Sequence, residues 1–340
     1  MPLFTAITTI QPPTDCVISL SNRVQACNGT LVVAGDSKGP SAYDLPNCKF
    51  LDIAGQEALQ FSITDELPKK HYARKNVAYL YAIREGASCI YETDDDNRPN
   101  AEWSPRQETI ESALSVDADQ GWVNVYRYFT DENIWPRGLP LDCIANDVPE
   151  TKRASSPLQC PIQQGLVNNS PDVDAIWRLV MDRPFDFSDK KSTTVCLQQG
   201  SWCPFNTQST WWWPVAYPLL YIPSYCSFRM CDIWKSFVAQ RCLWELGCGI
   251  AFHPPEVIQD RNQHDLAKDF EDEIPGYTLN NKIRSILEGC NLQLGVENVS
   301  NNLVTCYEEL SRNGIFPHEE ISLVLRWRSD VQNAMAGCEN

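Results

Sequence analysis

Apolar and polar positions alternate in blocks along the first hundred residues, and the blocks predict strands followed by helices. Residues Leu3 to Ile10 and Thr30 to Ala34 are apolar and β-rich, which is typical of strands, and a turn sequence closes the second segment. Residues Asp15 to Ala26 between them have room for a helix. Strands that alternate with helices are the pattern of an α/β layer with parallel strands. We therefore predict an α/β fold.

The clearest predicted helix covers Tyr72 to Glu85, where apolar residues fall at helical spacing and Gly86 follows as a stop signal. A short apolar strand at residues 87–91 comes next, and it leads into the acidic triplet Asp94 to Asp96. Open α/β sheets bind ligands beyond the carboxyl ends of their strands. The triplet is therefore predicted to lie at a ligand site.

The carboxyl-terminal part of the chain has a different pattern. Beyond Asp260 the sequence becomes charged, and helical spacing returns around residues 279–292, 302–313 and 319–335. We expect residues 1–260 to form the ligand-binding domain. Residues 261–340 are expected to form a helical extension packed on it.

Composition narrows the classes of function. Of 340 residues, 43% are apolar, which is enough for a packed core. The formal charge of -16 argues against a nucleic-acid partner, because proteins bind nucleic acids through clustered Lys and Arg. The amino-terminal segment is too short and polar for a signal sequence, and the apolar stretch from Trp211 to Ile222 is broken by prolines. No membrane insertion is expected. The chain as given is expected in the cytoplasm, or in the Golgi lumen if it is an excised catalytic domain.

The 15 cysteines are odd in number and spread along a chain large enough to fold without disulfides, so we expect most of them to be reduced. No Cys-x-x-Cys pair occurs, and the four histidines do not stand at zinc-site spacing from cysteines. A structural zinc site is not expected.

Three adjacent carboxylates repel one another unless a cation neutralises them. Oxygen ligands favour Mg²⁺ or Mn²⁺ over zinc, and such ions commonly bridge carboxylates to substrate phosphates. The triplet Asp94 to Asp96 therefore suggests a divalent-metal site. A solvated acidic turn is an equally reasonable interpretation of these residues alone.

Several motifs stand in a fixed order along residues 4–260. They are Pro12 to Asp15, Gly35 to Lys38, Lys75 to Ile83 with Gly86-Ala87 and the triplet, Ile134 to Leu141, Pro171 to Ala175, Asp232 to Trp234, Gln240 to Gly247 and Pro254-Pro255. This order resembles the STELLO-type glycosyltransferases of plants. A more distant similarity runs to the reversibly glycosylated polypeptides, the plant UDP-arabinopyranose mutases. Both resemblances imply a GT-A fold, a Rossmann-like mixed sheet flanked by helices, and a UDP-sugar ligand.

The resemblance also implies roles for the donor side of the site. Thr9 and Asp36 would hold the nucleobase and ribose, Asp94 and Asp96 would face the metal, and Asp95 would lie nearer the ribose. Arg74 and Lys75 are candidates to neutralise the diphosphate, although a solvated helix start explains them equally well. Members of the family carry a histidine shortly after the Pro-Pro pair as a metal ligand. This chain has none there, so Gln259, Asp260, His264 or water would have to replace it.

The resemblance places the catalytic base of an inverting enzyme at Asp232, which precedes a helix-forming stretch; a plain helix N-cap is the alternative. Asp172 and Asp174 would share one side if they lay on a strand, and they are candidate substrate ligands unless they lie in a surface loop. Trp212 is a candidate for stacking on a sugar, although tryptophan runs are more often core, and Arg229 is a candidate for the diphosphate.

Together these features predict a divalent-metal-dependent glycosyltransferase that moves a sugar from a UDP-sugar donor to a carbohydrate acceptor with inversion. Two alternatives remain open from sequence. One is a mutase-like enzyme that rearranges a UDP-sugar, and the other is a non-catalytic UDP-sugar-binding scaffold of a glycan-synthesis complex.

Overall fold

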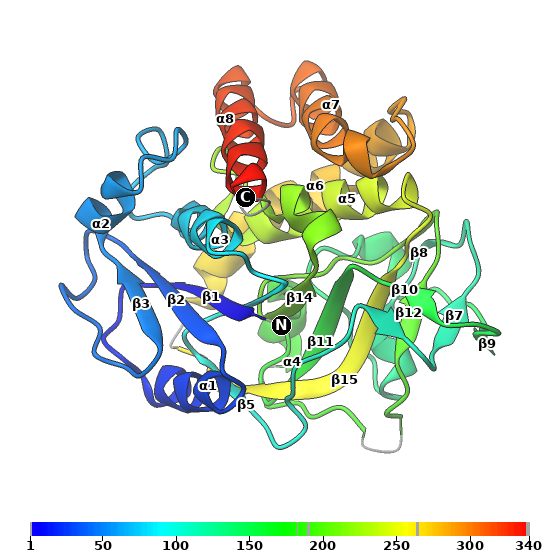
Figure 1. Ribbon diagram of the computed structural model, residues 1–340. Coiled ribbons are helices and arrows are strands. Elements are labelled where there is room, and N and C mark those ends of the chain that lie inside the picture. The colour runs from blue at the N-terminus through cyan, green and yellow to red at the C-terminus, as the bar shows by residue number, and fades with distance from the viewer. Residues whose placement is uncertain (1, 182, 189–190, 263–264, 338–340) are drawn as a thin grey trace.

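A mixed β-sheet with helices on both faces forms the centre of the computed structural model, which describes residues 2–181, 183–188, 191–262 and 265–337 (Figure 1). Within these residues the main sheet has 11 strands in the order β3-β2-β1-β4-β14-β11-β15-β12-β7-β9, and β5 pairs with β15. The strands are β1 (Leu3–Thr9), β2 (Thr30–Gly35), β3 (Cys48–Leu51), β4 (Cys89–Thr93), β5 (Asn97–Pro99), β7 (Leu114–Val116), β9 (Thr151–Arg153), β11 (Ile162–Asn168), β12 (Val195–Leu197), β14 (Ser209–Trp212) and β15 (Ile250–Gln259). Two short pairs, β6 (Thr109–Ile110) with β10 (Leu158–Gln159) and β8 (Gly121–Trp122) with β13 (Ser201–Trp202), lie beside it.

The amino-terminal part of the sheet confirms the predicted parallel layer. Strands β3, β2, β1 and β4 are all parallel, with Phe4 of β1 opposite Thr30 of β2 and Ile90 of β4. Strand β14 then pairs antiparallel to both β4 and β11, and β11 is parallel to β15. Strands β1, β2, β4, β11 and β15 therefore run in one direction, and their carboxyl ends meet at one edge of the sheet.

The helices predicted at residues 15–26, 72–85, 302–313 and 319–335 appear close to their expected positions, whereas the helix expected around residues 279–292 begins 13 residues earlier, at Leu266. The helices are α1 (Asp15–Ala26), α2 (Ile53–Ala58), α3 (Lys75–Arg84), α4 (Ala175–Met181), α5 (Cys231–Trp244), α6 (Leu266–Glu288), α7 (Val299–Arg312) and α8 (His318–Ala336). Short 3-10 turns are η1 (Tyr72–Arg74), η2 (Val125–Tyr128), η3 (Leu141–Cys143), η4 (Pro214–Leu220), η5 (Phe228–Met230) and η6 (Val296–Asn298). In Figure 1, α3, α5, α7 and α8 lie on one side of the sheet and α1 on the other.

Alternating side chains of the central strands feed two separate cores, as the pleat of a strand requires. Leu3 and Ile7 of β1 pack in the smaller core with α1, whereas Phe4 and Ala6 pack in the larger core with α3 and α5. The larger core continues without a break into α7 and α8. The carboxyl-terminal helices therefore share the apolar interior of the sheet domain.

The cysteines behave as the composition suggested. All 14 cysteines in the described part of the chain are free thiols, and most of them are buried. Among the helices that the structure describes, none combines the length and apolar character needed to cross a membrane.

Candidate functional site

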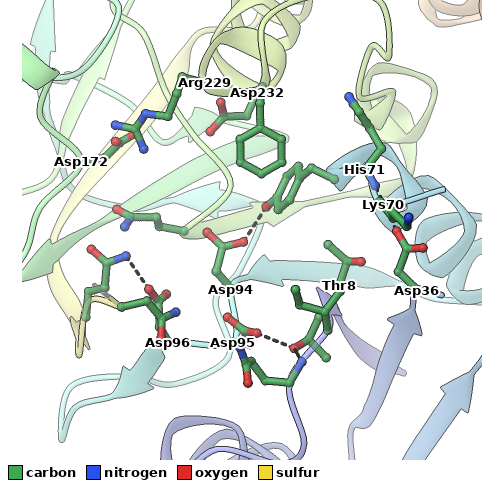
Figure 2. Close-up of a pocket in the computed structure, with 18 of the residues that line it drawn as sticks. Thr8, Asp36, Lys70, His71, Asp94, Asp95, Asp96, Asp172, Arg229 and Asp232 are labelled. Atoms are coloured by element: carbon green, nitrogen blue, oxygen red, sulfur yellow. Dashed lines mark hydrogen bonds between the residues drawn. The ribbon is translucent and has the colours of Figure 1, made fainter. Parts of the chain in front are cut away.

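A pocket of about 640 Å³ lies at the edge of the sheet where the parallel strands end (Figure 2). Thr8 and Thr9 reach it from the end of β1, Asp36 from the end of β2, and the acidic triplet from the end of β4. Figure 2 shows the triplet in the middle of the pocket, with Asp36 and His71 on one side and Asp172 and Arg229 on the other. This position beyond the carboxyl ends of strands is the one that the sequence predicted.

The three carboxylates of the triplet point to different neighbours. Asp94 Oδ1 accepts hydrogen bonds from the Tyr72 hydroxyl at 2.5 Å and from Lys75 Nζ at 3.0 Å. Asp95 accepts a short hydrogen bond from the Thr9 hydroxyl, and Asp96 Oδ2 accepts one from Gln259 Nε2 at 3.0 Å. The three carboxylates therefore have different neighbours: Asp95 is bound to β1, Asp96 to β15, and Asp94 to η1 and α3.

Asp96 is the member of the triplet with a buried carboxylate oxygen, Oδ1, that lacks a hydrogen-bond partner among the described residues. Burial, followed by the charges of Asp94 and Asp95, raises the pKa of Asp96 to about 7. Burial also raises the pKa of Asp95, against the hydrogen bond from Thr9. A cation bound here would reduce the repulsion among the three carboxylates and would give Asp96 Oδ1 a partner.

These residues fit a divalent cation whose remaining ligands are substrate phosphates and water. Within the described residues no group of three His, Cys, Asp or Glu side chains is arranged to hold a metal ion. Mg²⁺ commonly uses one or two carboxylates and completes its shell with substrate phosphates and water. Asp96 and Asp94 can supply the carboxylates, whereas Gln259 already donates to Asp96 and Asp260 lies half exposed beside Arg98. His264 lies outside the described residues.

The side of the pocket near β2 is rich in hydrogen-bonding groups. Asp36 accepts hydrogen bonds from the backbone N–H of Ser37 at 2.5 Å and of His71 at 3.0 Å. Burial alone would raise the pKa of Asp36, but backbone N–H groups outweigh it and the pKa is lowered. Burial lowers the pKa of His71, whose Nδ1 accepts from the Ala73 N–H. Asp36 is therefore an ionised acceptor on this wall.

On the opposite side, one arginine joins two aspartates. Arg137 donates to Asp172 with Nε and Nη2, both at 2.8 Å, and to Asp232 with Nη1 at 3.0 Å and Nη2 at 2.8 Å. All three side chains are at least nine-tenths buried, yet all line the pocket. Burial would raise the pKa of Asp172, but Arg137 outweighs it and the pKa is lowered. The cluster carries one positive and two negative charges.

Local backbone explains how Arg137 reaches α5. The next residue, Gly138, has a φ of +91°, and a Cβ there would lie 2.4 Å from Cγ2 of Ile233. Only glycine fits so close to the helix. Asp232 is the second residue of α5 and Met230 is the N-cap, so Asp232 does not act as the helix cap.

Arg229 reaches the same wall from η5. Its Nε and Nη2 donate to Glu273 Oε1 of α6 at 3.0 Å and 2.7 Å, and Glu273 is fully buried. The carbonyl oxygen of Arg229 accepts a short hydrogen bond from Arg137. Helix α6 thus fixes a pocket residue by a buried ion pair.

Four predicted site residues lie outside the pocket lining. Arg74 is buried and donates to Gln56 Oε1 at 2.8 Å and to the carbonyl oxygens of Thr64 and Leu67, so it ties three segments together behind the pocket. Lys75 is also buried and reaches the pocket only through Asp94. The solvated helix start considered for this pair is therefore wrong.

The other two are Asp174 and Trp212. Asp174 lies outside any strand, is fully buried, and accepts from Trp135 Nε1 at 2.7 Å and from the Trp177 N–H at 2.8 Å. Trp212 is fully buried in β14, where its Nε1 donates to Glu92 Oε1 at 2.7 Å. Neither side chain faces the cavity.

Several lining residues had no role in the sequence analysis. They include Arg137, Tyr72, Lys70, Phe228 and Gln208. Arg137 was visible as the only charge within the apolar motif Ile134 to Leu141, and such a charge needs a buried partner. Its partners come from two distant segments, which no local pattern reveals.

Helix α8 supports the loop that leads to the pocket. Glu320 is fully buried and accepts from the Tyr221 hydroxyl and from the backbone N–H of Ser224 at 3.1 Å and of Tyr225 at 2.7 Å. This loop continues into η5, which carries Phe228 and Arg229.

Replacing Glu320 by alanine should lower the free energy of unfolding by about 1–3 kcal/mol, because the buried Ser224 N–H and the buried Tyr221 hydroxyl lose their acceptor. Denaturant unfolding measures the change. The exposed neighbour provides the control, since Glu319→Ala should cost less than about 1 kcal/mol. Equal effects of the two substitutions would contradict the anchoring role of Glu320.

Comparison with known proteins adds independent information. The model of the family described as STELLO glycosyltransferases matches residues 229–336, from η5 to α8. A protein of Arabidopsis thaliana named probable glycosyltransferase STELLO2 is 32% identical over 256 residues, which cover 70% of this chain and 33% of that protein. Probable glycosyltransferase STELLO1 of the same plant is 31% identical over 254 residues, with 69% and 33% covered. The chain therefore spans about a third of the length of the curated relatives it matches.

Proposed function

The chain belongs to the STELLO family of glycosyltransferases, and from this membership and the pocket we propose that it transfers a sugar from a UDP-sugar to a carbohydrate acceptor with inversion. The observation that carries the proposal is the pocket itself. It gathers Asp36 and Thr9, the acidic triplet, and Asp232 at the edge where the parallel strands end. Asp36 and Thr9 would bind the nucleotide, the acidic triplet would act on the diphosphate, and Asp232 would lie beside the transferred sugar.

The nucleotide would occupy the side of the pocket formed by β1 and β2. The ionised Asp36 accepts hydrogen bonds, as ribose hydroxyls require, and Thr9 with Asp95 offers a second polar group. Lys38 and Lys70 also line this side and can face phosphate oxygens. This distribution supports a nucleoside diphosphate as the ligand.

A divalent cation, Mn²⁺ or Mg²⁺, would be held by Asp96 with Asp94. When bound, such an ion stabilises the negative charge of a departing nucleoside diphosphate. The orphaned Oδ1 of Asp96 is the observation that supports this site. Lys75 balances part of the charge of the triplet from within the protein.

Asp232 is the proposed base, which takes the proton from the acceptor hydroxyl as its oxygen attacks the anomeric carbon. Its Oδ1 accepts from Arg137 Nη1 and from the Ile233 N–H, whereas among the described residues its Oδ2 accepts from Arg137 Nη2 alone and keeps a lone pair for a hydroxyl. Its place in the first turn of α5 also favours the negative charge. Arg137 is then a positioning residue, because it fixes the plane of the carboxylate.

The proposal is tested by incubating the protein with Mn²⁺, a panel of UDP-sugars and glycan acceptors, and by analysing the products with NMR. We expect a glycosidic product with inverted anomeric configuration that forms only in the presence of an acceptor. A rearranged UDP-sugar formed without acceptor would establish a mutase instead. Binding of UDP without any turnover across the panel would establish a scaffold.

The metal site makes a separate prediction. Replacing Asp96 by asparagine should weaken Mn²⁺-dependent binding of UDP by at least about tenfold, because even groups that only support metal ligands are worth that much. Calorimetry with and without EDTA measures the effect. Asp260→Asn removes a nearby half-exposed carboxylate that is not part of the pocket lining and should change the affinity less than about twofold. Unchanged binding in Asp96→Asn would remove Asp96 from the metal site.

A further inference from the structure

A second, smaller pocket of about 110 Å³ adjoins the main pocket, and we refer to it as the inner compartment. Its walls include Tyr72, Asp94, Thr207, Phe228, Arg229 and Asp232, and all of these except Thr207 also line the main pocket. The volume corresponds to roughly seven to eleven water-sized spaces. A single sugar ring that protrudes partly into the main pocket suits such a space, whereas a nucleoside does not.

The charged side chains on the compartment walls already form ion pairs within the protein. Arg137 already binds the carboxylates of Asp172 and Asp232, and Arg229 binds Glu273. The carboxylates of Asp94 and Asp232 line the compartment too, paired with Lys75 and Arg137. Four carboxylates (Asp94, Asp172, Asp232 and Glu273) therefore stand against three cations (Lys75, Arg137 and Arg229). Among the described residues that form these walls, both guanidinium groups are therefore already neutralised. A ligand carboxylate would meet negative charges there and would have to compete for its counter-ion.

The polar groups of the walls suit hydroxyls. Carboxylate oxygens accept hydrogen bonds from hydroxyl groups, and the hydroxyls of Tyr72 and Thr207 lie 2.5 Å apart at one wall. Phe228 is 56% exposed although it is a large apolar side chain, and its ring contacts those of His71 and Tyr72 edge-on. An aromatic surface beside carboxylates can pack against the C–H groups of a sugar while the carboxylates bind its hydroxyls.

We propose that the inner compartment binds the sugar ring of the nucleotide sugar and that it selects a neutral sugar over a sugar acid. The inference rests on the proposed function, in which the main pocket holds a UDP-sugar. It adds the chemical class of the transferred group. The selectivity comes from the excess of carboxylates over cations around the compartment, where Arg137 and Arg229 are already paired.

Two pairs of ligands test this selectivity, because the members of each pair differ only at carbon 6, which is a hydroxymethyl group in the neutral sugar and a carboxylate in the acid. UDP-glucose is compared with UDP-glucuronic acid, and UDP-galactose with UDP-galacturonic acid, by calorimetry on the wild-type protein with Mn²⁺. We expect the better neutral ligand to bind at least about tenfold more tightly than its acid partner, since like charges at close range in a pocket repel strongly. Equal or tighter binding of the acids overturns the inference. Failure of UDP itself to bind would instead overturn the proposed function.

A variant of the compartment provides a second readout. Thr207→Val keeps the shape of the side chain and removes its hydroxyl, and it should weaken binding of the preferred UDP-sugar by about three- to tenfold while leaving the affinity for UDP unchanged. Thr5→Val is the matched control, because Thr5 is buried in β1, its hydroxyl has no partner in the described part of the chain, and it does not line the pocket. The control should change neither affinity. Equal losses for UDP and UDP-sugar in Thr207→Val, or no loss at all, contradict the assignment of the compartment to the sugar.

Discussion

Replacing Asp232 by asparagine is expected to lower the rate of sugar transfer by about 10²- to 10⁴-fold, because a positioned general base contributes that much. Asparagine has nearly the shape of aspartate but cannot take the proton of the acceptor hydroxyl. Binding of UDP should persist, since Asp232 lies on the side of the pocket away from Asp36. Steady-state kinetics and calorimetry on the same sample separate the two effects.

The structure offers a matched control for this substitution. Asp172 is bound by the same guanidinium and is equally buried, so Asp172→Asn disturbs the ion pair with Arg137 in a similar way. We expect it to lower stability about as much as Asp232→Asn and to lower transfer far less. Near-normal turnover in Asp232→Asn, or equal losses of turnover in both variants, would remove Asp232 from the role of base.

The largest effect on stability is expected from Arg137→Met. Methionine keeps an unbranched apolar stem but leaves Asp172 and Asp232 buried without their shared cation. Removal of one partner from a buried ion pair costs about 3–5 kcal/mol. Denaturant unfolding measures the loss. Arg183→Met is the control, because Arg183 pairs with Glu132 at the surface and such a pair contributes at most about 1 kcal/mol. Similar losses in the two variants would contradict the structural role of Arg137.

The effect of Arg137→Met should also depend on pH. Arg137 lowers the pKa of Asp172 in the folded state, so the pair stabilises the fold at neutral pH. This stabilisation is lost as the pH falls through the lowered pKa, below the ordinary value of 3.8. The difference between wild type and variant should therefore be largest at neutral pH and shrink in acid. Unfolding curves between neutral and acidic pH check this, and a pH-independent difference would contradict it.

The sequence predicted much of the fold because the informative segments are local. The helix from Asp15 to Ala26 and the parallel arrangement of β1, β2 and β4 are confirmed by the structure. These elements carry their own periodicity and turn signals, so short windows of sequence suffice. The same reasoning located the acidic triplet at a strand end that faces a pocket.

The parts of the site that escaped prediction depend on long-range contacts. The stretch around Trp212 was recognised as apolar, but its insertion as an antiparallel strand between β4 and β11 is set by pairing with residues far away in sequence. From the sequence, Arg74 is a charge at the start of a helix. In the structure it is buried and donates hydrogen bonds to the carbonyl oxygens of Thr64 and Leu67. Sequence spacing does not report which side of a helix start faces the interior.

The Asp172–Asp174 pair illustrates the same limit. Two-residue spacing predicts a common direction only on a strand. The segment lies instead before α4, where Asp172 turns to Arg137 and Asp174 turns to Trp135 and the α4 backbone. The sequence could suggest both carboxylates but could not separate the one that lines the pocket from the one that does not.

The support of the pocket by α6 and α8 has a consequence for chimeric proteins made from members of this family. Glu273 of α6 contacts Arg229, and Glu320 of α8 contacts residues 221–225. The pocket loop and these two helices should therefore come from the same parent protein. A crossover placed between residues 245 and 265 would join a pocket loop from one parent to carboxylates from another. Such hybrids should keep these buried contacts only when both parents share the partners.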